Sequence, residues 1–246
     1  MIYFIGAGPG DVELITIKGK KLLENCDVVI YAGSLVNPEL LKYAKDGAKI
    51  YNSATMNLDE IINAMKDAFE KGADVARLHT GDPSIYGAIR EQMEALDKLA
   101  IPYEVIPGVS SFSAAGAVLK RELTVPGQSQ TIILTRVEGR TPVPEEESLN
   151  ALAKHKATMA IFLSINQIEK IAGDLAKVYG SDTPIAVVYK ATWEDQKIVQ
   201  GTLSDIAEKV KEAGICKTAL ILVGNFLSDE YDFSCLYNKT FSHEYR

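Results

Sequence analysis

The sequence predicts an α/β protein with two αβα domains, and three observations support this prediction. In the first half, short apolar runs of strand length alternate with amphipathic runs of helix length, which favours a mostly parallel five-stranded sheet covered on both faces. Residues 121–130 are polar and contain a Pro-Gly dipeptide, so we place a boundary there, between domains 1–120 and 121–246. The strand-like runs 184–189 and 197–202 are joined by a loop too short for a helical crossover, which predicts an antiparallel pair and a mixed C-terminal sheet.

The clearest helix of the first domain is expected at residues 57–71. Its apolar side chains recur at helical spacing, Asn57 and Glu60 have the spacing of a capping box, and Gly72 can end the helix. The other elements expected in this domain are strands at 1–5, 27–31, 48–51, 73–78 and 103–106, and helices at 13–24, from Ile85 to Leu99 and at 111–119.

In the second domain, Ser164 is expected to begin a helix that Gly180 ends. Gln167 would complete an S-x-x-Q capping box with Ser164. The tail from Ser228 is rich in Tyr and Phe and has no readable period. The remaining expected elements are strands at 131–135, 158–163, 184–189, 197–202 and 219–223 and a helix at 204–213.

Composition excludes several classes of function for this 246-residue chain. A net charge of −7 without a dense basic stripe argues against a nucleic-acid partner. The sequence has no apolar run of membrane-spanning length, so no membrane partner is expected. Cys26, Cys216 and Cys235 are odd in number and far apart, and the three histidines have no paired ligand spacing. We therefore expect a cytoplasmic protein with no disulfide framework and no protein-bound metal.

We expect the chain to be organised around residues 79–87 (His-Thr-Gly-Asp-Pro-Ser-Ile-Tyr-Gly), which lie between a predicted strand and a predicted helix. Such loops build ligand sites in α/β folds, although a plain strand–helix connection with a capping Asp explains these nine residues equally well. A second glycine-rich loop, residues 6–11, departs from the dinucleotide fingerprint because Asp11 replaces its third glycine and Pro9 removes an N–H donor. The sequence also has no P-loop, nucleophile elbow or H-E-x-x-H motif, which favours chemistry in which the protein mainly positions two reactants.

Three loops taken in order resemble the tetrapyrrole (corrin/porphyrin) methyltransferases. The first is residues 6–11 with the following Leu-Ile-Thr and Lys-Gly, the second is 81–83 with Tyr86-Gly87, and the third is 107–111. The match runs to about residue 226. Within that family, residues 31–36, 133–136, 138–142 and 189–193 resemble the precorrin-4/cobalt-precorrin-4 branch, whose members methylate ring carbon 11 on the route to cobalamin.

The resemblance implies two α/β domains with an active-site cleft between them, a homodimer, and an anionic tetrapyrrole as substrate. It also implies S-adenosylmethionine as the methyl donor, bound in folded form, with S-adenosylhomocysteine as product. Because the sulfonium is cationic, an aspartate in the cofactor loop is acceptable. The residues that the resemblance places at the cofactor are Pro9, Thr80, Gly81, Asp82, Ile85, Tyr86, Ser110, Ser111, Leu163 and Ala191.

Candidate residues for the substrate and for catalysis carry alternatives. The carboxylates of a tetrapyrrole need basic partners, for which Arg136, Arg140, Lys190 and Arg90 are the candidates, the alternative for each being solvated surface charge. Family members that methylate uroporphyrinogen use an Asp just after the second strand, where this chain has Tyr31-Ala32, so no general base is assigned. The aromatic residues Tyr31, Tyr86 and Trp193 either line a trough or pack in the core, and His79 is either structural or an acid–base group.

Two other functions stay open at this point. The same fold and cofactor can serve another tetrapyrrole or a macromolecule, as in relatives that resemble diphthine synthase or ribosomal RNA methylases. A non-enzymatic or redox nucleotide-binding domain would instead bind NAD or ATP. The sequence does not determine whether the ring already carries cobalt.

Overall fold

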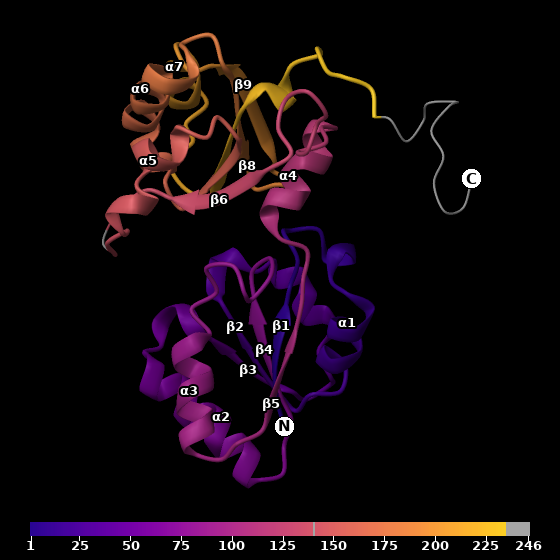
Figure 1. Ribbon diagram of the computed structural model, residues 1–246. Helices are drawn as coiled ribbons and strands as arrows, with labels where there is room; N and C mark the ends of the chain where they lie inside the picture. Colours follow the sequence, from indigo (N-terminus) through magenta and orange to yellow (C-terminus); the bar gives the residue numbers. More distant parts are fainter. Residues whose placement is uncertain (140, 235–246) are drawn as a thin grey trace, which may run out of the picture. The chain divides into compact units, whose positions relative to one another are not determined.

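A computed structural model describes residues 1–139 and 141–234, and the chain divides into two compact units (Figure 1). The first unit comprises Met1–Ala114 and the short segment Ala191–Glu194. The second comprises Ala115–Lys190 and the described residues from Asp195 onward. Among the described residues, every helix is too short or too polar to cross a bilayer.

The first unit is built on a five-stranded parallel sheet with the order β3-β2-β4-β1-β5. Residue Gly6 at the end of β1 is in register with His79 at the end of β4. Because all five strands run in the same direction, the loops that follow them emerge at one edge of the sheet. The strands are β1 (Ile2–Gly6), β2 (Val28–Tyr31), β3 (Lys49–Asn52), β4 (Val75–His79) and β5 (Tyr103–Ile106).

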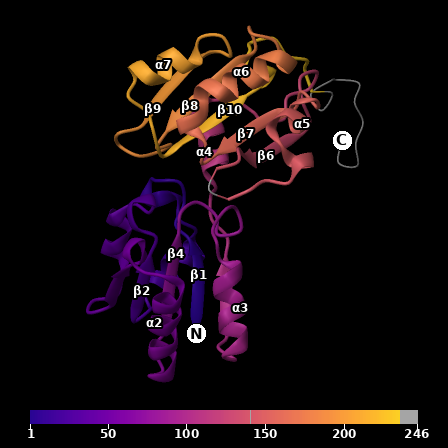
Figure 2. The same ribbon diagram turned by 90° about the vertical axis from the view of Figure 1, so that its left-hand side faces the viewer.

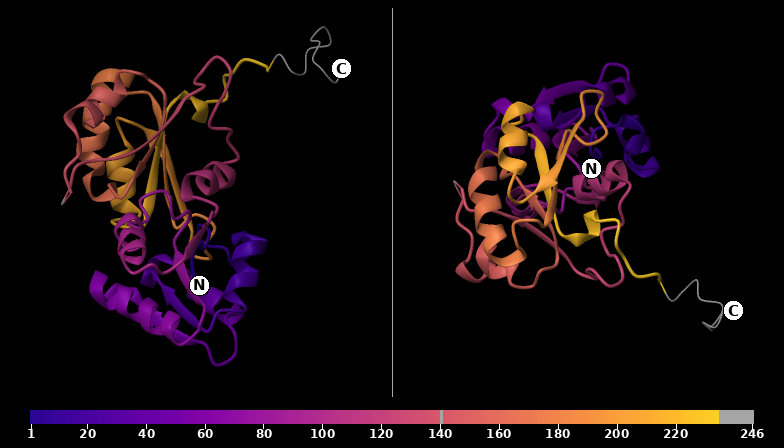
Figure 3. Two further views of the ribbon diagram at one scale, coloured as in Figure 1. Left: turned by 60° about the horizontal axis from the view of Figure 1, so that its bottom comes forward. Right: turned by 90° about the horizontal axis from the view of Figure 1, so that it is seen from above.

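Side chains alternate along these strands and form one buried cluster on each face of the sheet. On β1, Ile2 and Phe4 join the cluster under α2 (Leu58–Glu70) and α3 (Arg90–Lys98). The next residue, Ile5, joins the opposite cluster under α1 (Ile17–Leu23). Figures 1 and 3 show α1 on one side of the strands and α2 and α3 on the other, so this unit has the expected three layers.

The second unit holds a mixed five-stranded sheet with the order β6-β7-β10-β8-β9. Strand β6 pairs parallel with β7, whereas the other neighbours are antiparallel, including the predicted β8–β9 pair. The α/β class with one parallel and one mixed sheet is therefore confirmed. The strands are β6 (Ile132–Arg136), β7 (Thr158–Phe162), β8 (Pro184–Tyr189), β9 (Lys197–Thr202) and β10 (Ala219–Val223).

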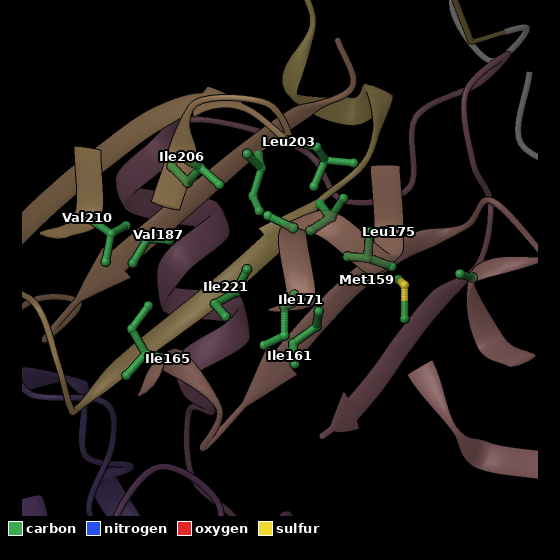
Figure 4. Close-up of a cluster of buried hydrophobic side chains, with 14 of the residues drawn as sticks. Met159, Ile161, Ile165, Ile171, Leu175, Val187, Leu203, Ile206, Val210 and Ile221 are labelled. Carbon is green, nitrogen blue, oxygen red and sulfur yellow. The ribbon is translucent and has the colours of Figure 1, made fainter. Parts of the chain in front are cut away.

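Helices α5 (Leu149–Ala153), α6 (Ile168–Tyr179) and α7 (Ile206–Glu212) cover one face of the second sheet (Figure 2). Figure 4 shows the core that they close, in which Leu175 of α6 lies near Met159 of β7. Helix α4 (Ser111–Leu119) matches its predicted bounds, whereas the sequence analysis missed α5. Short 3-10 helices lie at Val12–Leu14, Gly33–Leu35, Pro38–Tyr43, Ser53–Thr55, Glu145–Glu147, Ile165–Gln167 and Asn225–Leu227.

The capping box at the start of α2 is confirmed, but the one predicted at Ser164 is wrong. Asn57 accepts from the N–H of Glu60, and the Glu60 carboxylate accepts from the N–H of Asn57. The Ser164 hydroxyl instead donates to the carbonyl of Phe162 and accepts from the N–H of Val137, on the neighbouring β6 side of the sheet. The serine therefore joins two strand ends and does not cap a helix.

Two predicted helix starts are also wrong. The segment expected to be helical from residue 13 contains a 3-10 turn, after which Thr16 returns to extended backbone and caps α1 by accepting from the N–H of Gly19. The helix expected from Ile85 begins only at Arg90, because the loop before it adopts left-handed backbone that a helix cannot contain.

Candidate functional site

Three glycine-rich loops converge at the carboxyl ends of β1, β4 and β5. Gly8 and Gly81 exchange backbone hydrogen bonds, with the N–H of Gly81 donating at 2.8 Å and the N–H of Gly8 at 3.3 Å. A Cβ built on Gly6 would lie 2.5 Å from the Cα of Gly108, and one built on Gly108 would overlap the carbonyl oxygen of Gly81. The backbones therefore approach more closely than any side chain at Gly6 or Gly108 would permit.

The carboxylate of Asp82 joins the loop after β4 to the loop after β5. Its Oδ2 accepts from the N–H of Gly108 at 2.9 Å, while Oδ1 accepts from the N–H of Ser84 at 2.8 Å and from the Ser84 hydroxyl. Burial raises the pKa of Asp82, but these hydrogen bonds outweigh burial and lower it overall. Asp82 is therefore an anion whose oxygens hold loop backbone in place.

The segment Ala191–Glu194 packs on the first glycine-rich loop, although it lies far away in sequence. Trp193 Nε1 donates to the carbonyl of Pro9 at 2.8 Å, and the Thr192 hydroxyl accepts from the N–H of Asp11 at 2.9 Å. A Cβ on Gly10 would overlap the indole of Trp193. Of the predicted cofactor residues, the structure thus brings Pro9 and Ala191 to neighbouring segments of the first unit.

Strained backbone marks the predicted site residues after β4 and after β7. Tyr86 and Ala88 have φ values of 55° and 48° on either side of Gly87, whose own Cβ would overlap the carbonyl of Pro83. In the second unit, Leu163 has φ of 54° and is 70 % exposed. Backbone strain costs about 1–3 kcal/mol at such residues and is concentrated at ligand sites, which fits a binding role for these positions.

The remaining predicted cofactor residues lie within the converging loops. Thr80 is exposed next to the buried Gly81, Ile85 is half-buried, and the buried Ser110 accepts from the N–H of Ala114 through its carbonyl. Ser111 begins α4.

The basic residues predicted for the substrate are held in different ways. The guanidinium of Arg136 donates to the carbonyls of Thr141 and Pro142 at 2.9 and 2.8 Å, so it closes its own loop. Lys190 pairs with Asp195 at 2.6 Å, and this hydrogen bond raises the pKa of the lysine. Arg90 is exposed at the start of α3, and Arg140 lies outside the described residues.

Sequence reasoning missed two residues that hold these loops and one buried cation on the strand that leads to them. Thr192 and Asn37 hold the first loop by side-chain bonds to Asp11 and Gly10, and no local pattern signals such long-range contacts. Arg77 is buried on β4. The alternation of side chains along this strand could have predicted that Arg77 faces α2 and α3.

The charge of the three glycine-rich loops favours some classes of ligand over others. Residues 6–11, 80–87 and 107–111 contain two carboxylates, Asp11 and Asp82, and no lysine or arginine. This chemistry suits a cationic group and disfavours a pyrophosphate, which is usually held by free N–H donors and basic side chains.

Comparisons with known proteins agree with these features. Residues 1–207 match the family described as Tetrapyrrole (Corrin/Porphyrin) Methylases. The chain is 61 % identical to the cobalt-precorrin-4 C(11)-methyltransferase of Methanocaldococcus jannaschii, covering all of this chain and 95 % of the relative.

Two solved structures are also similar. The X-ray structure of a cobalt precorrin-4 methyltransferase aligns with a TM-score of 0.90 at 50 % identity, covering 92 % of this chain and 95 % of that one. A uroporphyrin-III C-methyl transferase from Thermus thermophilus, complexed with S-adenyl homocysteine, aligns with a TM-score of 0.77 at 28 % identity, covering 92 % and 93 %.

Proposed function

Because this chain belongs to the tetrapyrrole (corrin/porphyrin) methylases, we propose that it is an S-adenosylmethionine-dependent methyltransferase acting on carbon 11 of precorrin-4 or cobalt-precorrin-4 in cobalamin biosynthesis. The single observation that carries the proposal is the 61 % identity over the whole chain to the Methanocaldococcus enzyme of that name. Its name specifies the cobalt form, so cobalt-precorrin-4 is the first substrate to test.

The converging loops support S-adenosylmethionine as the methyl donor. When bound, this molecule supplies a methyl group on a cationic sulfur. The loop residues Pro9, Gly81 and Asp82 would hold it, with Asp82 acting through the backbone that it fixes. The remaining residues proposed for this site are Thr80, Ile85, Tyr86, Ser110, Ser111, Leu163 and Ala191. The absence of basic side chains in the three loops fits a sulfonium, and the relative crystallised with S-adenyl homocysteine has the same fold.

The reaction depends more on how the protein orients the two reactants than on a nucleophile from the protein. The macrocycle carries its own electron-rich carbon, which must lie in line with the methyl–sulfur bond at near-attack distance. A rigid loop framework, held by Asp82 and by the glycine contacts of Gly6 and Gly108, can fix one reactant in this way. Basic residues would neutralise the substrate carboxylates; Arg136, Arg140 and Lys190 stay the predicted candidates.

The proposal extends to assembly and location. The resemblance to the family suggests a homodimer in the cytoplasm, without nucleic-acid partners and without a resident metal. These points rest on the resemblance and on the acidic net charge of −7.

A direct assay tests the proposal. The purified chain is mixed with S-adenosylmethionine carrying a ¹³C-methyl group and with precorrin-4 or cobalt-precorrin-4 in parallel. We expect one labelled methyl per macrocycle, located at carbon 11 by NMR, and one S-adenosylhomocysteine released. Methylation of elongation factor or of ribosomes, with no tetrapyrrole product, would instead support the macromolecular alternative.

A further inference from the structure

A buried histidine in the first unit has a ring nitrogen that nothing satisfies. His79, at the end of β4, is 4 % exposed, and its ring packs against Phe4 with centroids 5.9 Å apart. Among residues 1–139 and 141–234, its Nε2 is the buried side-chain polar atom for which no hydrogen-bond partner is found. Buried polar groups are nearly always paired, so such an atom calls for an explanation.

The contacts of His79 indicate that its Nε2 is a hydrogen-bond acceptor. Burial lowers the pKa of His79 to about 3, with the charge of Arg77 acting in the same direction, so the ring is neutral at physiological pH. A hydrogen bond with the backbone of Gly87 opposes this shift, which means that the Gly87 carbonyl accepts from the ring. Since Nε2 has no partner, Nδ1 is the donor, and Nε2 carries a lone pair that needs a donor from outside the fold.

A buried cation lies two residues away on the same face of β4. Arg77 is 4 % exposed; its Nε donates to Gln92 at 3.1 Å, and its Nη1 donates to the carbonyl of Ile30 at 3.3 Å. In the described part of the chain Arg77 forms no ion pair, and no hydrogen bond from its Nη2 is found. Burial lowers the pKa of Arg77 to about 10, so it stays charged at neutral pH without an anion beside it.

Both side chains line one cavity of about 420 Å³. Apolar residues that follow β2 and begin α2 form part of its wall, and the strained loop at Tyr86 and Ala88 forms another part. The titratable side chains in the wall, besides His79, are Arg77, Tyr86 and Glu91; Glu91 is exposed on α3. The cavity therefore presents an unpaired cation and a neutral acceptor inside a partly apolar wall.

A carboxyl group matches this pair of side chains. One oxygen accepts from the guanidinium of Arg77, and the other shares a proton with Nε2 of His79. A hydroxyl would satisfy Nε2 but has no second oxygen to accept from the guanidinium of Arg77.

We propose that the Arg77–His79 cavity binds one carboxyl side arm of the macrocyclic substrate, with Arg77 donating to one carboxyl oxygen and His79 sharing a proton with the other. The arm enters as a carboxylate, and one proton taken from solvent is held between its oxygen and Nε2 and is released when the arm leaves. The proposal rests on the proposed function, because that function supplies the carboxyl-rich substrate. His79 and Arg77 are thus binding residues that fix the position of the macrocycle.

A first experiment measures kinetics with the substrate of the assay above. His79→Phe keeps a ring beside Phe4 and removes Nε2; we expect KM to rise about tenfold, with kcat within about twofold and S-adenosylhomocysteine affinity unchanged. His79→Gln, which restores a polar group, should recover part of the loss and serves if the Phe variant does not fold. His155→Phe, at an exposed histidine, is the matched control and should leave KM unchanged. An unchanged KM in His79→Phe overturns the proposal.

A second experiment needs no turnover and separates this proposal from the proposed function. The chain has three histidines, so ¹³Cε1-histidine labelling gives few NMR signals, and His79→Phe identifies the one of interest. Propionate should shift the His79 signal and raise its titration midpoint, whereas n-propanol should do neither. Equal shifts with both probes, or none with propionate, overturn the cavity assignment. A propionate-specific shift in a protein that methylates no tetrapyrrole would leave the carboxyl site standing and reject the proposed function.

Discussion

The Oδ2 atom of Asp82 accepts a hydrogen bond from the N–H of Gly108, 2.9 Å away, and this bond connects two loops that follow different strands. The other carboxylate oxygen is bonded within its own loop, to Ser84. The acidic residue of the Gly-Asp-Pro motif therefore acts by setting the shape of a backbone wall.

Replacing Asp82 by Asn should weaken both the fold and the cofactor site. An amide has one oxygen for the two backbone N–H groups that the carboxylate serves, so one donor would face an NH₂ group. We expect a loss of about 2 kcal/mol in the free energy of unfolding and about tenfold weaker binding of S-adenosylhomocysteine. Urea unfolding and isothermal titration measure the two effects. Asp67→Asn, at an exposed position of α2, is the control, and equal affinities for the two variants would contradict the prediction.

Adding a methyl group at Gly108 should separate the loops. The new Cβ would overlap the carbonyl oxygen of Gly81 and lie 2.7 Å from the Cα of Gly6, and neither backbone atom can move without its strand. Gly108→Ala should therefore cost about 3 kcal/mol of stability, measured by urea unfolding. Gly173→Ala, inside α6 where a Cβ meets nothing within 4 Å, should stabilise by about 1 kcal/mol. A harmless Gly108→Ala would show that the loops are not in close contact.

The single tryptophan should report cofactor binding. Trp193 donates to the carbonyl of Pro9 at 2.8 Å, beside the first glycine-rich loop. S-adenosylhomocysteine should change its fluorescence, with a midpoint that equals the dissociation constant from calorimetry. Trp193→Phe removes the hydrogen bond and should cost about 1 kcal/mol of stability, whereas Tyr231→Phe at an exposed site should cost nothing measurable. Calorimetric binding without any fluorescence change would argue against a cofactor near Pro9.

His79 should make the fold sensitive to mild acid. Its pKa is 6.5 in the unfolded chain and about 3 in the folded one, so between these values the unfolded state binds more protons. Stability is full above pH 6.5 and falls as the pH drops toward about 3, by up to about 1.4 kcal/mol per pH unit from this group. Urea unfolding at about pH 7 and about pH 5 should show a smaller loss in His79→Phe than in the wild type. An identical pH dependence in the two proteins would refute the assignment, and His155→Phe should behave as the wild type.

Sequence patterns predicted most strands and both sheet types because the signals are local. The alternation of Ile2 and Phe4 with Ile5 is visible in the chain, as is the capping box of Asn57 and Glu60. The wrong capping box depends on a distant partner. Ser164 looks like a helix cap, yet its hydroxyl accepts from an N–H 27 residues away.

Some features of the candidate site could likewise be predicted from local sequence, and others could not. The three glycine-rich loops could be found from their motifs, because each needs small residues at fixed places. The bond from Trp193 to Pro9 spans 184 residues, and the unsatisfied nitrogen of His79 is a property of three-dimensional packing. Neither this bond nor this unsatisfied nitrogen can be predicted from the local composition of the chain.

The placement of Ala191–Glu194 with the first unit has a consequence for how such proteins can be recombined. Its flanking strands, β8 and β9, belong to the second unit, so a piece of the first unit's site is encoded inside the second unit's gene segment. A chimaera made by a single crossover near α4 would pair a first unit with another protein's tryptophan segment. Because a Cβ at residue 10 would overlap the indole of Trp193, we expect a chimaera to keep this contact only if Gly10 and Trp193 come from the same parent.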